Sequence, residues 1–291
     1  MSFYSNRFVF HCQLSDTIRD LGLKTPESIE RFDNIRYGED KKWQVLDVYR
    51  PKKAEGKLPV IISNHGGGWV YGSKKTYQYY CMNLAERGFV VINFSYRLAP
   101  KFKFPAALED TNLVFDWLMK NADKYNIDIN NIFAVGDSAG AQIVGIYSNI
   151  LTNKEYAKAF PFEVPKGLKL NALGLNCGKY VIKYDKSEGF FRDLLPNKGT
   201  EKELRLISVV ENITEDFPPC YILTANEDFL KDEPAELMKV LKDKGIEHDY
   251  KLYGDEKNPL YHVFHCNIKS EDAKKANDDE IEFFKKFVKK E

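Results

Sequence analysis

The chain has 291 residues, of which 43% are hydrophobic, and its 43 Lys and Arg residues balance 43 Asp and Glu residues. This content is enough for one large domain or two small ones with a sizeable core, and it excludes global disorder. The zero net charge gives no electrostatic case for nucleic acid or an acidic membrane surface as a partner.

The cysteines predict a reducing compartment. There are five of them, scattered and without a Cys-x-x-Cys spacing: Cys12, Cys81, Cys177, Cys220 and Cys266. An odd and scattered set favours free thiols over a disulfide framework or a zinc site. Residues 1–14 carry Arg7 and His11 and lack the apolar run of a signal peptide, and no stretch is long enough to span a membrane. We therefore expect a cytoplasmic protein without a membrane partner.

Hydrophobic periodicity predicts an alternation of strands and helices. From the N-terminus, we expect one or two helices around 5–21 and 26–31, a hairpin of strands 31–38 and 43–50, a strand at 58–64, a helix at 77–87 that Gly88 caps, a strand at 89–94 and a helix at 106–124. Then follow a strand at 132–135, a helix at 142–151, a strand at 170–175, a helix at 201–210, a strand at 220–225, a helix at 234–244, a strand at 248–253 and a helix at 272–289.

This order predicts one α/β domain over residues 1–291, because strands that alternate with helices form a mostly parallel sheet covered on both faces. About eight strands are expected. Two pieces, residues 1 to about 30 and about 177–216, do not fit the alternation and are expected to be appended to the domain or inserted in it.

The stretch at 132–141 reads I-F-A-V-G-D-S-A-G-A. A short apolar run, a turn between two glycines and a helix-like segment form the setting of the nucleophile elbow, G-x-S-x-G. Ser138 would stand at the strained tip of the turn, which leaves no room for side chains at Gly136 and Gly140. The helix N-terminus behind it favours negative charge. The motif G-x-S-x-G by itself also fits an ordinary glycine-rich turn, but the flanking strand and helix favour a catalytic serine.

Residues 65–69, His-Gly-Gly-Gly-Trp, follow the strand expected at 58–64. Three successive glycines leave the backbone bare, so that its N–H groups can approach a ligand closely. After this strand of a hydrolase sheet, they would bind the oxygen that becomes negative when Ser138 attacks a carbonyl, together with the N–H of Ala139. A flexible loop or a phosphate cradle are the alternatives, although both common phosphate motifs are absent. His65 is expected to brace the loop.

A serine nucleophile needs a base, and the base needs an acid that orients it. In folds that carry the nucleophile elbow, these three residues follow one another along the chain in the order serine, acid, histidine. The loop after strand 220–225 offers Asp228 as the acid, with Glu227 and Asp232 as rivals that could equally be a solvated loop charge or a helix N-cap.

For the base, His262 and His265 both follow the last expected strand, so their spacing alone does not separate them. His11 comes too early, and His248 lies within a strand. Both are expected to be ordinary surface or packed histidines.

Five stretches together resemble the hormone-sensitive-lipase-like branch of the α/β-hydrolases, which includes many bacterial carboxylesterases. They are His65-Gly66-Gly67-Gly68, Tyr96-Arg97-Leu98-Ala99-Pro100 with Phe104-Pro105-Ala106-Ala107 and Asp110, Gly136-Asp137-Ser138-Ala139-Gly140, Asp228-Phe229-Leu230-Lys231-Asp232, and His262-Val263-Phe264. The resemblance covers about residues 58–290, and the stretches occur in the family's order.

This resemblance implies an α/β-hydrolase fold with Ser138 as nucleophile and Asp228 as acid. It implies His262 as base, because the family's histidine is usually followed two residues later by phenylalanine. It also implies an oxyanion hole of Gly67, Gly68 and Ala139, no metal or organic cofactor, and a small helical cap. The cap would come from residues 1–30 and 177–216.

The expected activity is hydrolysis of small-molecule esters through an acyl-enzyme. Short acyl groups are expected, since Trp69, Phe190 and Phe191 would wall a small pocket and the second cap piece is broken by charges at Lys179, Lys183, Asp185, Lys186 and Asp193. Two alternatives stay open: a small amidase or arylformamidase with the same triad, and a non-catalytic ligand-binding member of the fold. The exposed sheet edge after the last strand could pair two subunits in a homodimer.

Overall fold

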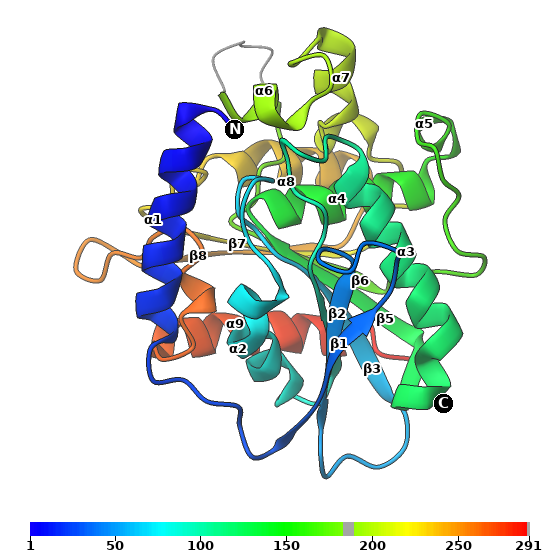
Figure 1. Cartoon of the computed structure of the whole chain (residues 1–291), viewed down its shortest axis with the longest axis vertical. Helices are drawn as coiled ribbons and strands as arrows, with labels where there is room; N and C mark the ends of the chain where they lie inside the picture. The colour runs from blue at the N-terminus through cyan, green and yellow to red at the C-terminus, as the bar shows by residue number, and fades with distance from the viewer. Residues whose placement is uncertain (183–188, 290–291) are drawn as a thin grey trace.

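Eight strands form one sheet through the middle of the molecule (Figure 1). The structure is a computed structural model that describes residues 1–182 and 189–289. The strands are β1 (Ile29–Arg36), β2 (Val45–Pro51), β3 (Leu58–Asn64), β4 (Val90–Phe94), β5 (Ile127–Asp137), β6 (Ala172–Asn176), β7 (Cys220–Ala225) and β8 (His248–Tyr253). Their order in the sheet is β1-β2-β4-β3-β5-β6-β7-β8.

The sheet is mostly parallel, which confirms the predicted fold class. β1 pairs with β2, and β2 with β4, in antiparallel fashion, whereas all pairings among β3 to β8 are parallel. The central strands are apolar and buried on both faces, as parallel sheets require. In the register, Asn64 lies opposite Gly136, and Gly136 lies opposite Leu175. The loops after β3, β5 and β6 therefore meet at one edge.

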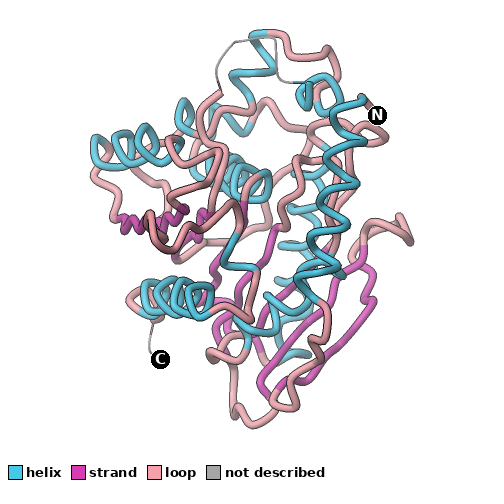
Figure 2. Tube along the Cα trace, turned by 90° about the vertical axis from the view of Figure 1, so that its left-hand side faces the viewer, coloured by secondary structure: helices cyan, strands magenta, loops and turns pink. Residues whose placement is uncertain are grey.

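Helices cover both faces of this sheet, and Figure 2 shows them on either side of the strands. One face packs against α3 (Ala106–Asn121), α4 (Ala139–Thr152) and α8 (Glu233–Asp243), and the other against α2 (Lys74–Ala85) and α9 (Glu271–Lys285). The remaining helices of the described residues are α1 (Phe3–Asp20), α5 (Lys154–Ala157), α6 (Gly189–Leu194), α7 (Glu201–Leu206) and the 3-10 turns η1 (Ala122–Tyr125), η2 (Val210–Asn212) and η3 (Phe264–Cys266). No helix in this part of the chain has both the length and the apolar character needed to cross a bilayer.

Most predicted elements agree with the structure, and three differ. The second N-terminal helix, expected at 26–31, is wrong, because Ile29 already pairs with Pro51 at the start of β1. The helix expected at 201–210 ends at Leu206, and the elbow strand is longer than its apolar run. The short α5 and α6 were not expected, since a single turn or two gives almost no periodic signal.

The N-terminal helix α1 lies beside α6 above the edge where the strands end (Figure 1). The N–H of Ser2 and the hydroxyl of Ser5 both donate to Asp193 of α6, at 2.8 and 2.6 Å. The rings of Phe8 and Phe190 also meet edge to face, 5.2 Å apart. The charges expected at 183, 185 and 186 lie outside the described residues.

Candidate active site

A strained turn joins β5 to α4 at Ser138. Its backbone has φ 53° and ψ −118°, a conformation that L-residues adopt only where the surroundings enforce it. A Cβ on Gly136 would lie 2.4 Å from the carbonyl carbon of Gly140, and one on Gly140 would lie 2.1 Å from the oxygen of Asn64. The prediction that neither position has room for a side chain is confirmed.

Ser138 opens into a cavity of about 540 Å³ at the edge of the sheet. Gly68 and Ala139 line the same cavity, so the serine lies next to both glycine-loop and helix backbone. The backbone N–H of Ser138 donates to the oxygen of Asn176 at the end of β6, at 2.9 Å. This bond fixes the turn against the neighbouring strand.

The glycine loop after β3 adopts conformations that only glycine tolerates well. Gly67 has φ +117° and Gly68 has φ +57°, and a Cβ on Gly67 would lie 2.2 Å from the oxygen of Tyr71. Within residues 1–182 and 189–289, the amides of Gly67 and Gly68 donate to no other protein group. Both amides are therefore free of a competing acceptor in these ranges, and Gly68 lines the cavity that contains Ser138.

His65 packs against this loop on the side of the protein interior. Its ring is fully buried and stacks on the ring of Tyr96 with centroids 4.0 Å apart, while the Tyr96 hydroxyl donates to the His65 oxygen at 2.8 Å. Burial lowers the pKa of His65 to about 4, so the imidazole is neutral near pH 7. These contacts support the bracing role that the sequence predicts.

Tyr77 joins the glycine loop to the elbow, and sequence reasoning missed it. Its hydroxyl accepts from the N–H of Gly66 at 3.0 Å and donates to Asp137 at 2.7 Å. Burial raises the pKa of Asp137 to about 6, although the bond from Tyr77 opposes this rise. Nothing local distinguishes Tyr77 in the sequence, because its two partners lie on other elements.

Asp228 and His262 face each other across the loops after β7 and β8. Asp228 Oδ1 lies 2.8 Å from His262 Nδ1, and it also accepts from the N–H of Leu230 at 2.8 Å. Burial opposes ionisation of Asp228, but hydrogen bonding and charge from His262 outweigh it and hold the pKa of the carboxyl below its ordinary value. The pair has the geometry of a base with the acid that orients it.

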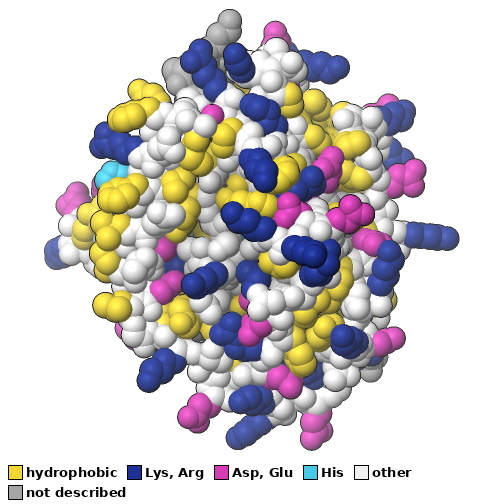
Figure 3. All heavy atoms as spheres, in the orientation of Figure 1, with side chains coloured by type: hydrophobic (Ala, Val, Ile, Leu, Met, Phe, Trp, Pro, Cys, Tyr) yellow, Lys and Arg dark blue, Asp and Glu magenta, His cyan; other side chains and the backbone are white. Residues whose placement is uncertain are grey.

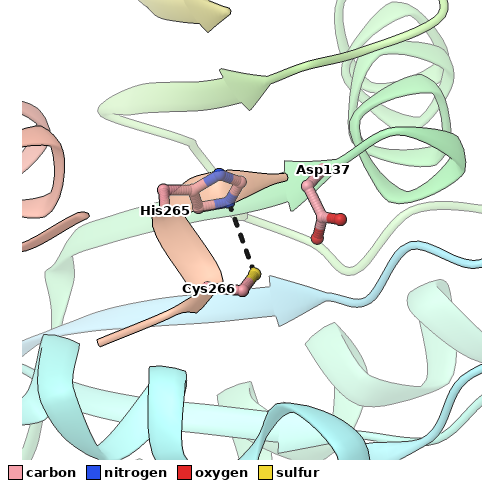
Figure 4. Close-up of side chains that lie close together, drawn as sticks. All are labelled: Asp137, His265 and Cys266. Atoms are coloured by element: carbon pink, nitrogen blue, oxygen red, sulfur yellow. Dashed lines mark hydrogen bonds between the residues drawn. The ribbon is translucent and has the colours of Figure 1, made fainter. Parts of the chain in front are cut away.

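The rival acids and the rival base lie elsewhere. Glu227 and Asp232 are exposed, and Asp232 stands at the N-cap of α8. His265 is fully buried, and burial lowers its pKa to about 3. Figure 4 shows the His265 ring facing Asp137, with its Nε2 3.6 Å from the Sγ of Cys266. His265 therefore belongs to a buried polar group behind the elbow.

Cys177 is a second residue that sequence reasoning missed. It has φ +46° directly after β6, and its Sγ lies within 4.8 Å of a carboxylate oxygen of Asp228 and of a ring nitrogen of His262. Burial, and then the neighbouring carboxylate, raise the pKa of this thiol. The thiol thus touches both the acid and the loop that carries His262.

Two groups of side chains in the described ranges could hold a metal ion by geometry. One is Asp137, His265 and Cys266, and the other is Cys177 with Asp228 and His262. In each group the potential ligand atoms lie within 4.8 Å of one another. The second group coincides with the acid and base described above.

Aromatic side chains form much of the cavity wall. Trp69 and Phe190 line it as expected, and Tyr4, Phe8 and Phe229 contribute as well. Phe191 does not line it; this buried ring lies behind Trp69, with centroids 5.8 Å apart. The polar part of the wall includes an ion pair of Lys179 and Glu233, 2.8 Å apart.

Comparison with known proteins places this arrangement in a family. A family model described as the alpha/beta hydrolase fold matches residues 61–265, which is well over half of the chain and spans the glycine loop, the elbow and the Asp228–His262 pair. The chain belongs to the alpha/beta hydrolase fold family.

The curated relatives of this α/β-hydrolase include esterases. The versiconal hemiacetal acetate esterase of Dothistroma septosporum is 28% identical over 225 residues, which cover 70% of this chain and 67% of that protein. The ethyl acetate hydrolase of Pseudomonas putida is 26% identical over 209 residues, or 68% of this chain and 65% of that one. The α/β-hydrolase chain thus spans about two thirds of the length of these relatives.

Solved structures agree on the fold of this α/β-hydrolase. Esterase B from Lactobacillus rhamnosis superposes with a TM-score of 0.89 at 21% identity, covering 98% of this chain and 95% of that chain. An esterase from Pyrobaculum calidifontis gives a TM-score of 0.77 at 24% identity, covering 98% and 93%. At these identities the likeness establishes the fold, including the eight-stranded sheet.

Proposed function

We propose that this protein is a serine carboxylic ester hydrolase that acts on short-chain acyl esters. The observation that carries the proposal is the 2.8 Å contact between Asp228 and His262, in a chain whose Ser138 stands on a strained elbow and opens into the same cavity as the glycine loop. The esterase names of the relatives support the reaction class.

In the proposed mechanism, His262 takes the proton of the Ser138 hydroxyl as its oxygen attacks the ester carbonyl. The negative oxygen of the tetrahedral intermediate is held by the N–H groups of Gly67, Gly68 and Ala139, and Gly68 and Ala139 line the same cavity as Ser138. The C–O bond to the alcohol then breaks, and His262 returns its proton to the leaving oxygen.

Water completes the proposed cycle. It attacks the acyl-enzyme while His262 accepts its proton, and His262 returns this proton to the Ser138 oxygen as the acyl C–O bond breaks and the carboxylic acid leaves. Asp228 keeps its hydrogen bond to Nδ1 throughout, so that Nε2 is the nitrogen that exchanges protons with the serine. Since the pKa of Asp228 is held below its ordinary value, this carboxylate is ionised at neutral pH and can balance the imidazolium.

The same groups could cleave an amide, so a small amidase or arylformamidase is the second candidate. A p-nitrophenol burst from p-nitrophenyl acetate would separate both enzymes from a non-catalytic binding protein. Matched ester and anilide substrates with the same acyl group separate the two enzymes. We expect a higher kcat/KM for the ester than for the anilide. A higher kcat/KM for the anilide would identify the protein as an amidase instead.

Acyl-chain preference is expected to favour acetyl to butyryl esters over octanoyl and longer ones. Phe190 and Trp69 line the cavity that contains Ser138, and we expect a long chain to collide with these rings. We expect kcat/KM to fall by about tenfold or more between p-nitrophenyl butyrate and octanoate. Phe190→Ala should move the optimum toward longer chains, because it removes one wall. A maximum at octanoate in the unmodified protein would show that the cavity holds a longer groove.

Asp228→Asn is expected to keep the fold and to lower kcat by about 10³ to 10⁴-fold, because an amide favours the wrong imidazole tautomer. Glu227→Gln and Asp232→Asn are matched controls that also remove one carboxylate, and their side chains are exposed. Both should retain nearly full activity in the same p-nitrophenyl butyrate assay. Greater damage from either control would assign the acid to that residue instead.

A further inference from the structure

Helix α1 turns its polar side chains toward the protein. The Tyr71 hydroxyl donates to Asp16 at 2.8 Å, and Arg19 donates to the backbone oxygen of Thr76 at 2.6 Å and pairs with Asp16 at 2.8 Å. Near the other end of the helix, the hydroxyl of Ser5 is buried against Asp193. Phe8 and Val9 also pack against the core, so the inner side of α1 mixes polar and apolar side chains, whereas an ordinary surface helix buries mainly apolar ones.

Five other apolar side chains of α1 and its C-terminal end face solvent. They are Phe3 (78% exposed), Phe10 (65%), Leu14 (53%), Ile18 (62%) and, just past the end of the helix, Leu21 (75%), and we call them the apolar stripe of α1. Their spacings of seven, four, four and three residues place them on one side of the helix. Figure 3 shows hydrophobic side chains gathered along the left-hand side of the molecule, over α1.

The charges on this side of α1 are basic. Arg7 is exposed and fills the gap between Phe3 and Phe10 in the stripe, and His11 is exposed beside it. The two acidic residues of the helix, Asp16 and Asp20, are instead held by Arg19 on the inner side. An apolar face with a cationic side chain, Arg7, and without acidic ones fits a helix that lies in the surface of an anionic bilayer.

The stripe continues into the mouth of the cavity. Tyr4 and Phe229 both line the cavity that contains Ser138, and they are 71% and 72% exposed. A second copy of the chain seated on this face would cover the mouth. A lipid surface would instead bring esters dissolved in it to the opening, so the position of the mouth favours lipid as the occupant.

We propose that the apolar stripe of α1 docks on the surface of a bilayer with anionic headgroups and presents esters held in that surface to the cavity. The delivery step rests on the proposed ester hydrolysis, whereas the docking step does not. The balanced net charge predicted no membrane partner, and the proposal departs from that expectation because docking depends on where the charges lie.

Vesicle flotation tests the docking step. Unilamellar vesicles are made of phosphatidylcholine alone, or of equal parts phosphatidylcholine and phosphatidylglycerol. The unmodified protein and Ser138→Ala should both float with the anionic vesicles. The triple variant Leu14→Gln, Ile18→Gln, Leu21→Gln should partition at least about tenfold less, because three apolar contacts are lost. Arg7→Gln should reduce the preference for anionic over neutral vesicles.

A control variant exchanges apolar residues that are equally exposed on other elements. Ile129→Gln with Leu252→Gln removes side chains that are 41% and 55% exposed on β5 and β8, and it should float like the unmodified protein. Thermal unfolding of each variant confirms that it is folded. Equal flotation of the triple variant and the unmodified protein, or absence of the unmodified protein from the vesicle fraction, would overturn the docking step while leaving the ester hydrolase proposal untouched.

Activity separates docking from hydrolysis. On dilute p-nitrophenyl acetate the triple variant should match the unmodified protein, since none of its three residues lines the cavity. On an ester dissolved in anionic vesicles it should be several-fold slower. Protein that floats but hydrolyses neither substrate would contradict the proposed function and the delivery step, but not the docking step. If light scattering finds a dimer that the triple variant dissociates, a second copy covers the stripe and the proposal is wrong.

Discussion

Ser138→Ala is expected to leave the fold intact and to reduce ester turnover by about 10⁴-fold or more. The hydroxyl is the only group that the substitution removes, and alanine fits the strained position as well as serine does. The measurement is kcat on p-nitrophenyl butyrate, with thermal unfolding as the check on folding. Ser15→Ala, which removes an exposed hydroxyl from α1, is the control and should retain full activity.

Covalent labelling tests the role of Ser138 without a measurement of turnover. A serine-reactive phosphonate should add its mass to the peptide that contains Ser138 in the unmodified protein, and the Ser138→Ala variant should gain no mass. Substantial turnover in Ser138→Ala, or labelling at another serine, would remove Ser138 from the mechanism.

His262→Gln is expected to reduce turnover by a similar factor, about 10⁴-fold or more, because it removes the group that is proposed to take the serine proton. Glutamine keeps a polar side chain of comparable size beside Phe229, whose ring centroid lies 4.3 Å from that of His262. His11→Gln changes an exposed histidine of α1 and should leave kcat unchanged.

The variant His265→Gln addresses the alternative base. His265 is fully buried against Cys266 and Tyr80, so its replacement is expected to lower thermal stability more than kcat. The double variant of Ser138→Ala with His262→Gln should be no slower than either single variant, because the two residues act as one unit. If His265→Gln abolishes turnover in protein that is still folded while His262→Gln does not, the assignment of the base is reversed.

The strands could be predicted closely because buried parallel strands carry a strong local signal. Residues 58–64 and 220–225 match the buried strands β3 and β7 to the residue, and 248–253 matches the partly buried edge strand β8, since each run ends at a loop or a helix signal. The elbow and the glycine loop could be recognised for a related reason. Their glycines are required by contacts within a few ångströms, and these constraints leave a pattern in the local sequence.

What the sequence did not reveal depends on contacts between distant segments. Tyr77 meets Asp137 across 60 positions, and Cys177 meets Asp228 only because β6 and β7 are neighbours in register. The side of α1 that faces solvent could not be predicted either. The spacing of its apolar residues is the same as in an ordinary helix that packs its apolar stripe against the core. Only the buried partners of Asp16 and Arg19 reveal that the stripe faces solvent.

The hydroxyl of Tyr77 connects the proposed oxyanion donors to the elbow in the resting protein. Because it accepts from Gly66 and donates to Asp137, the glycine loop cannot drift from the elbow unless one of these two hydrogen bonds breaks. The donors on the loop and the donor at Ala139 therefore keep a nearly constant separation before any ester arrives. Dipoles that are already aligned cost little reorganisation energy when charge appears on the carbonyl oxygen, whereas water molecules in the same place would have to turn first.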